Sequence, residues 1–135
     1  MIKAELKTEY GVEKFYYSVD VFIGTFDVYP SYSFEEAFGD KNLRSAKLKA
    51  IQRAKELEMI LLYQGMFFLP FASPGEFVHG ENACYSICVS LVQEFDEDNE
   101  LEYQIHTIKG EDYDVITEAL LFEADIFEQL TICNN

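Results

Sequence analysis

The chain has 135 residues, a length typical of one domain, and 49% of them are hydrophobic. With 12 Phe and 9 Tyr it carries enough apolar bulk for one core, so we expect a single domain over residues 1–135. The 25 acidic residues outnumber the 10 Lys and Arg and set a formal net charge of −15. Because such a charge repels phosphates and anionic lipids, direct binding to nucleic acid or to membranes is not expected.

The negative charge is concentrated in the second part of the chain. Residues 1–59 hold nine basic and ten acidic residues, whereas residues 60–135 hold fifteen acidic residues and a single basic one, Lys109. No repeat or linker separates the two parts, so this asymmetry does not mark a domain boundary. The N-terminus lacks the pattern of a signal peptide and the three cysteines are an odd number, which favours a cytoplasmic protein with free thiols.

The first part of the chain predicts a hairpin followed by a long helix. Alternating apolar residues over 2–8 and 15–23 predict two strands joined near Gly11. The sequence Ser33-Phe34-Glu35-Glu36 matches a capping box and predicts a short helix ending at Gly39, with Asp40 capping a second helix. That second helix has one apolar stripe, whose alanines predict close packing on a sheet: Leu43, Ala46, Ala50, Ala54, Leu57 and Leu61.

The second part predicts more strands and a final helix. Residues 62–69 read as a buried strand and 70–82 as a loop. The strand over 84–95 has a bulky face, which we expect in the core, and a small face of Cys84, Ser86, Cys88 and Ser90, on which we expect the alanine helix to pack.

A turn at 96–100 leads to a returning strand over 101–107, and residues 112–131 fit a helix better than a strand. On the helical interpretation Glu123 falls in the apolar stripe. This indicates either a wrong assignment, which we favour, or a carboxylate facing a groove.

Together these elements predict an α+β domain. An antiparallel sheet of about five strands would be covered by one long helix and by an acidic, helical C-terminal element, in the order ββα(β)ββα.

No motif for catalysis or cofactor binding is found, so we expect a non-enzymatic protein without a cofactor. Cys84 and Cys88 stand about 13 Å apart on a strand, at ~3.3 Å per residue, which is too far to share one zinc ion with His79 or His106. The acidic run 96–100 lacks the glycine and the final glutamate of a calcium-binding EF-hand loop. We therefore expect no metal site.

The leading functional hypothesis is an acidic interaction protein that docks its C-terminal half on a basic protein surface, and one form of it is a nucleic-acid-mimicking inhibitor. The simpler explanation is that the acidity only confers solubility. The predicted partner-binding residues are Asp96, Glu97, Asp98, Glu100, Glu102, Asp112, Asp114 and Glu118.

Two other functions compete with this hypothesis. The first is a small-ligand-binding module that uses the 70–82 loop, with Phe71, Phe77 and His79 around the small-residue face. The second is a homo-oligomer formed through the aromatic run 67–71 or through an open sheet edge.

Overall fold

The computed structural model describes residues 1–9, 11–25, 32–63, 67–68, 77–78, 83–96, 98–108 and 113–133. Its elements in chain order are β1 (Ala4–Thr8), β2 (Gly11–Thr25), β3 (Tyr32–Phe38), α1 (Leu43–Tyr63), β4 (Phe67–Phe68), β5 (Phe77–Val78), β6 (Ala83–Glu94), β7 (Glu100–Ile108) and α2 (Tyr113–Cys133). The expected α+β domain with a five-stranded antiparallel sheet and two helices is confirmed. None of the described helices is long and apolar enough to cross a membrane.

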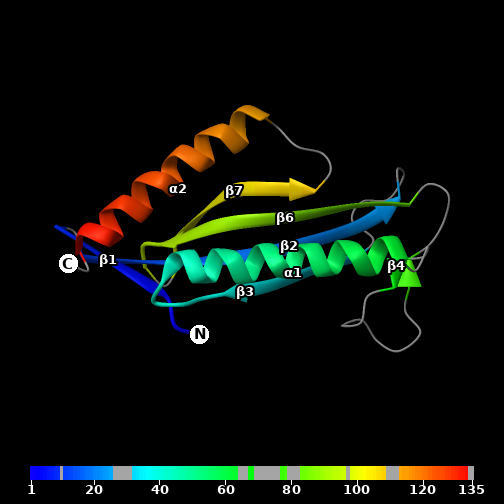
Figure 1. Cartoon of the computed structure of the whole chain (residues 1–135), viewed down its shortest axis with the longest axis horizontal. Coiled ribbons are helices and arrows are strands. Elements are labelled where there is room, and N and C mark those ends of the chain that lie inside the picture. Colours follow the sequence, from blue (N-terminus) through cyan, green and yellow to red (C-terminus); the bar gives the residue numbers. More distant parts are fainter. Residues whose placement is uncertain are drawn as a thin grey trace.

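The long strand β2 organises the sheet. Its first half pairs with β1 and its second half with β3, so these two strands share one of its edges. Its other edge pairs with β6 over twelve residues, and β7 pairs with the far side of β6. All of these pairings are antiparallel, and the strand order is therefore β1 and β3, then β2, β6 and β7 (Figure 1).

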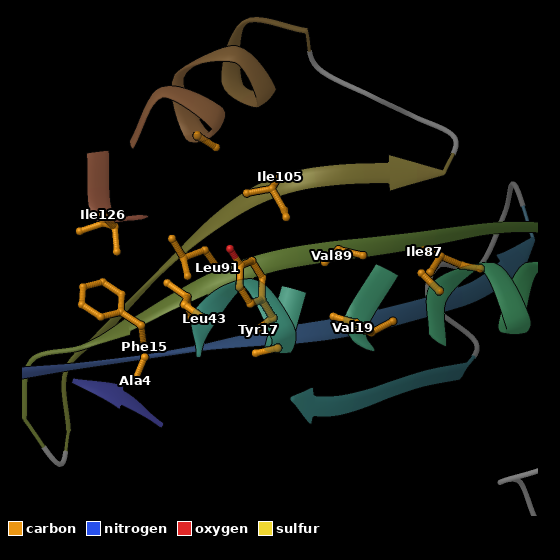
Figure 2. Close-up of a cluster of buried hydrophobic side chains, with 14 of the residues drawn as sticks. Ala4, Phe15, Tyr17, Val19, Leu43, Ile87, Val89, Leu91, Ile105 and Ile126 are labelled. Carbon is orange, nitrogen blue, oxygen red and sulfur yellow. The ribbon is translucent and has the colours of Figure 1, made fainter. Parts of the chain in front are cut away.

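Both helices lie on the same face of the sheet. Helix α1 runs along β2, β6 and β3, while α2 crosses from β7 toward β1 (Figure 1). Between the helices and the sheet lies the core, shown in Figure 2, which buries alternate residues of the central strands, including Phe15, Tyr17, Val19, Val21, Ile87, Val89 and Leu91. The predicted close packing of the helix is confirmed, because Ala46, Ala50 and Ala54 are all buried.

The predicted short helix at 33–36 is wrong. This segment belongs to strand β3, where Phe34 and Phe38 pack against the core and Glu36 pairs with Arg53 of α1. Sheet pairing with β2 partly buries both phenylalanines against the core, and this gain outweighs a capping box that would stabilise only a turn or two.

The cap of α1 also differs from the expectation. The Oδ1 atom of Asn42 accepts hydrogen bonds from the backbone N–H groups of Arg44 and Ser45, so Asn42 rather than Asp40 caps the helix. Asp40 instead accepts a hydrogen bond from the backbone N–H of Asn42, before the helix begins.

Two predictions around the loop and the small-residue face are also wrong. Helix α1 continues to Tyr63, so the strand expected at 62–69 shrinks to Phe67–Phe68, which pairs with Phe77–Val78 inside the expected loop. The alanine stripe packs on the bulky face of β6, because burying Ile87, Val89 and Leu91 removes far more apolar area from water. The small-residue face lies on the opposite side of the sheet.

Helix α2 confirms the helical interpretation of the tail, so our preferred explanation for Glu123, a wrong assignment, is wrong. Its side chain is buried between the helices and β2. It accepts a hydrogen bond of 2.5 Å from the hydroxyl of Tyr17 and forms an ion pair with Lys47 of α1. Burial and the bond to Glu123 raise the pKa of Tyr17, so the phenol stays protonated.

Candidate functional site

The face of the sheet opposite the two helices, here called the open face, carries the candidate site. Alternation along the strands places Tyr16, Ser18 and Asp20 of β2 on it, and the cross-strand pairs add neighbours from β3, β6 and β7. Its centre is a floor of small side chains: Ser18 is 0% exposed, Ser90 2% and Cys88 5%. The thiol of Cys88 is free, as predicted.

Three carboxylates from three strands act on one another across this floor. Asp20 of β2 lies opposite Glu35 of β3 in the register, and Glu102 stands on β7 at the other edge of the sheet. Burial, followed by the charges of Glu35 and Glu102, raises the pKa of Asp20 from 3.8 to about 6. Partial desolvation and the charges of Glu35 and Glu100 raise the pKa of Glu102. The three side chains, here called the open-face carboxylates, therefore repel each other.

The basic residues that the structure describes form no ion pair with these carboxylates. Within the described residues, the ion pairs join other acids: Lys3 to Glu94, Lys47 to Glu123, Lys49 to Asp40, and Arg53 to both Glu36 and Glu56. Asp20 accepts a hydrogen bond from the hydroxyl of Ser18, and at 3.4 Å this bond is weak. Among the residues that the structure describes, no Lys or Arg lies within 4.0 Å of the open-face carboxylates.

Tyr16 links the open-face carboxylates to the turn between β6 and β7. Its hydroxyl donates a hydrogen bond of 3.2 Å to Glu100, and burial together with the charge of Glu100 raises the pKa of Tyr16. On the other side, the ammonium of Lys3 lies 4.9 Å from the centre of the Tyr16 ring and 2.5 Å from Glu94. The aromatic ring therefore separates the cationic end of the open face from its acidic part.

The β6–β7 turn is built by one of its own carboxylates. Asp96 accepts hydrogen bonds from the backbone N–H groups of Asp98 and Asn99, at 2.9 and 3.0 Å, and from the Asn99 side chain. These bonds, the one from the Asn99 side chain first, lower the pKa of Asp96. A hollow of about 340 Å³ beside the turn is lined by Glu94, Asp96, Asp98, Asn99 and Glu100. Asp98 and Glu100 are exposed there.

One buried polar group on the open face has no partner. Among the described residues, the hydroxyl of Thr107 is the buried side-chain oxygen that makes no hydrogen bond. Thr107 pairs with Cys88, which in turn pairs with Asp20, so the hydroxyl lies in the same cross-strand row as the Asp20 carboxylate. This row therefore holds a buried hydroxyl whose hydrogen-bonding capacity is unused among the described residues.

The structure divides the predicted partner-binding residues into two groups. Asp96, Asp98, Glu100 and Glu102 lie together on the turn and on β7, whereas Glu118 is exposed on α2 in the helical layer. Asp114 stands in the first turn of α2, and Glu97 and Asp112 lie outside the described residues. For the alternative ligand site, Phe77 belongs to β5, and Phe71 and His79 lie outside the described residues.

Sequence reasoning missed Asp20 and Glu35, which belong to the part of the chain with almost no net charge. The signal for Asp20 was present, because it occupies a polar position of an alternating strand. Glu35 was missed because the capping-box interpretation assigned it to a helix, whereas it lies on strand β3. Neither these carboxylates nor other His, Cys, Asp and Glu residues within the described ranges form a group of three that could hold a metal ion.

Comparison with known proteins adds no assignment: no protein-family model, no curated protein and no solved structure matches this chain.

Proposed function

We propose that this chain is a non-enzymatic binding protein that docks its open face and the adjoining β6–β7 turn on a basic surface of a partner protein. The observation that carries the proposal is the set of open-face carboxylates Asp20, Glu35 and Glu102, which repel one another and lack a cation among the described residues. Glu100, Asp96 and Asp98 extend the same negative surface around the turn.

Solubility alone does not account for this arrangement. Fully exposed carboxylates confer solubility without loss of stability, and the chain has many of them on α2 and in the turn. A partly buried carboxylate whose pKa is raised by burial and by two other carboxylates instead lowers the stability of the folded state at neutral pH. Groups of this kind are typical of binding sites, where a partner removes the repulsion.

A basic partner would gain from this surface in two ways. Its Lys and Arg side chains would replace the mutual repulsion of the open-face carboxylates with attraction, and the negative field would accelerate association. Basic surfaces of matching charge are common on proteins that bind nucleic acid. Occupation of such a surface would make this chain an inhibitor of nucleic-acid binding. We also propose a cytoplasmic location, since the free thiol of Cys88 fits a reducing compartment.

The proposal is tested by capturing partners from lysate of the native host and by repeating the capture with two matched variants. The first variant neutralises the open-face carboxylates by Asp20→Asn, Glu35→Gln and Glu102→Gln. The control removes the same three charges from the exposed side of α2 by Glu118→Gln, Asp125→Asn and Glu128→Gln. Association of each variant with the purified partner is then measured by surface plasmon resonance.

We expect the wild type and the α2 control to bind the partner equally, and the open-face variant to associate more slowly and to bind more weakly. Equal binding by the open-face variant would refute the assignment of the docking surface. Equal weakening by both triple variants would show that net charge alone drives the interaction.

A further inference from the structure

A second concave surface of opposite charge lies beside the edge strand β1. It encloses about 880 Å³ and is lined by Met1, Ile2, Lys3, Glu5, Lys7, Lys14, Lys41 and Leu130. Among the described residues of its lining, four of the ten basic residues of the chain stand against one carboxylate. In a chain of net charge −15, such a gathering of ammonium groups is a local reversal of the surface charge. We call this hollow the lysine cavity.

Three of the four ammonium groups are available to a ligand. Lys3 already pairs with Glu94, at 2.5 Å. The ion pairs of the described residues otherwise use Lys47, Lys49 and Arg53 of α1, so Lys7, Lys14 and Lys41 are left without a carboxylate within 4.0 Å there. These three come from β1, from β2 and from the segment before α1, and the fold brings them to one cavity.

Protection of a sheet edge does not explain the whole cluster. Lysines on an edge strand hinder unwanted pairing with another chain, and this accounts for Lys3 and Lys7 beside β1. Lys14, however, stands on β2 inside the sheet, paired with both Glu5 and Glu94 in the register. Lys41 lies outside the sheet altogether. Neither of these two residues protects an edge.

The cavity also has an apolar wall that the fold holds in place. Met1 and Ile2 are 64% and 61% exposed, and Leu130 of α2 adds to the same lining. Ile2 is held close to Gly39, where a Cβ atom would come within 2.2 Å of the Ile2 carbonyl oxygen. Only glycine allows the two backbones to approach so closely, so Gly39 positions this wall.

We propose that the lysine cavity binds a small molecule that carries a phosphate monoester on an apolar body. A phosphate monoester has close to two negative charges at neutral pH and three acceptor oxygens, which match the three unpaired ammonium groups. The apolar body would lie against Met1 and Ile2, whose exposed side chains would lose contact with water. This site uses other residues than the open-face carboxylates and stands or falls independently of the proposed docking function.

The test uses the full chain with any purification tag at the C-terminal end, so that Met1 and Ile2 keep their surroundings. Phenyl phosphate is the probe, compared with inorganic phosphate and with benzoate, and binding is followed by calorimetry and by chemical-shift changes in NMR spectra. The cavity variant combines Lys14→Gln with Lys41→Gln. Its control, Lys49→Gln with Lys55→Gln, removes the same charge from α1 outside the cavity.

We expect phenyl phosphate to bind the wild type saturably and more tightly than either comparison ligand. The cavity variant should weaken binding at least about tenfold, or ~1.4 kcal/mol, and the control should leave it unchanged. Gly39→Ala should displace the wall and weaken binding of phenyl phosphate, while that of inorganic phosphate stays the same. Retained native circular dichroism would show that each variant still folds.

Each opposite result overturns the proposal. Absence of saturable binding, or equal weakening by the control, would show that the lysines form no site. If inorganic phosphate bound as tightly as phenyl phosphate, the apolar wall would contribute nothing to binding. If benzoate bound as tightly as phenyl phosphate, the site would have no preference for a dianion.

Discussion

Replacement of Asp20 by Asn should stabilise the folded chain at neutral pH. Asn is nearly isosteric with Asp, retains an acceptor for the Ser18 hydroxyl and removes the charge that Glu35 and Glu102 repel. A rise in the pKa of Asp20 from 3.8 to about 6 corresponds to an upper limit of about 3 kcal/mol, at ~1.4 kcal/mol for each tenfold change. Because Asp20 is only partly buried, solvent screening reduces the expected gain to about 1–2 kcal/mol.

The gain should depend on pH in a defined direction. The pKa of Asp20 is higher in the folded state than in the unfolded chain, so the folded state binds the extra proton. This contribution to wild-type stability is fully present below about pH 4 and is lost as the pH rises to about 6. The difference between Asp20→Asn and wild type should therefore be near zero at pH 4 and reach its full value above pH 6.

Urea unfolding at several pH values between 4 and 7.5, followed by circular dichroism, measures this difference. Glu118→Gln on α2 is the matched control, because it removes one exposed carboxylate away from the open face. A variant that is less stable than wild type at pH 7, or a gain that is the same at pH 4 and pH 7, would refute the argument that the open-face carboxylates repel one another.

Three further changes test other parts of the structure, each by urea or thermal unfolding. Ala50→Leu should destabilise the fold by roughly 1–3 kcal/mol, because Ala50 is fully buried against the sheet and a larger side chain overpacks the interface; an unchanged melting temperature would contradict this. Glu123→Ala should cost roughly 3 kcal/mol, since Tyr17 and Lys47 both lose their buried acceptor, and Glu123→Gln should restore part of that loss. Asp96→Ala should lower the melting temperature through lost turn hydrogen bonds, whereas Asp98→Ala, whose side chain makes none of these bonds, should change it less.

The fold was predictable from the sequence where local pattern and burial agree. The alternation in β2 and the alanine stripe of α1 both describe faces that lie against the same core, so periodicity alone identified them. The prediction was wrong around Glu35, because the four residues that match a capping box belong to a strand whose Phe34 and Phe38 pack against the core. Whether this segment forms a helix or a strand depends on its pairing with β2, a contact between separate parts of the chain that no local pattern contains.

The buried Glu123 illustrates the same limit for a polar residue. A carboxylate inside an apolar stripe looks like an error of assignment, because burial of a lone charge is costly. It becomes stable here because α1 supplies Lys47 and β2 supplies the hydroxyl of Tyr17. These two partners lie 76 and 106 positions away in the chain, so only the tertiary structure explains the residue.

The candidate site required the tertiary structure for a related reason. The charge count along the chain directed attention to residues 96–118, which include Glu100 and Glu102. Antiparallel pairing of β2 with β6, and of β6 with β7, then brings the nearly neutral first part of the chain against the acidic second part. This pairing lets the charge of Glu102 raise the pKa of Asp20. Basic residues of the first part of the chain instead form ion pairs on α1 or line the cavity beside β1. Within the described residues, the fold therefore gathers carboxylates without an ion-pair partner on the open face, and it gathers Lys7, Lys14 and Lys41, which have no carboxylate within 4.0 Å there, in the lysine cavity.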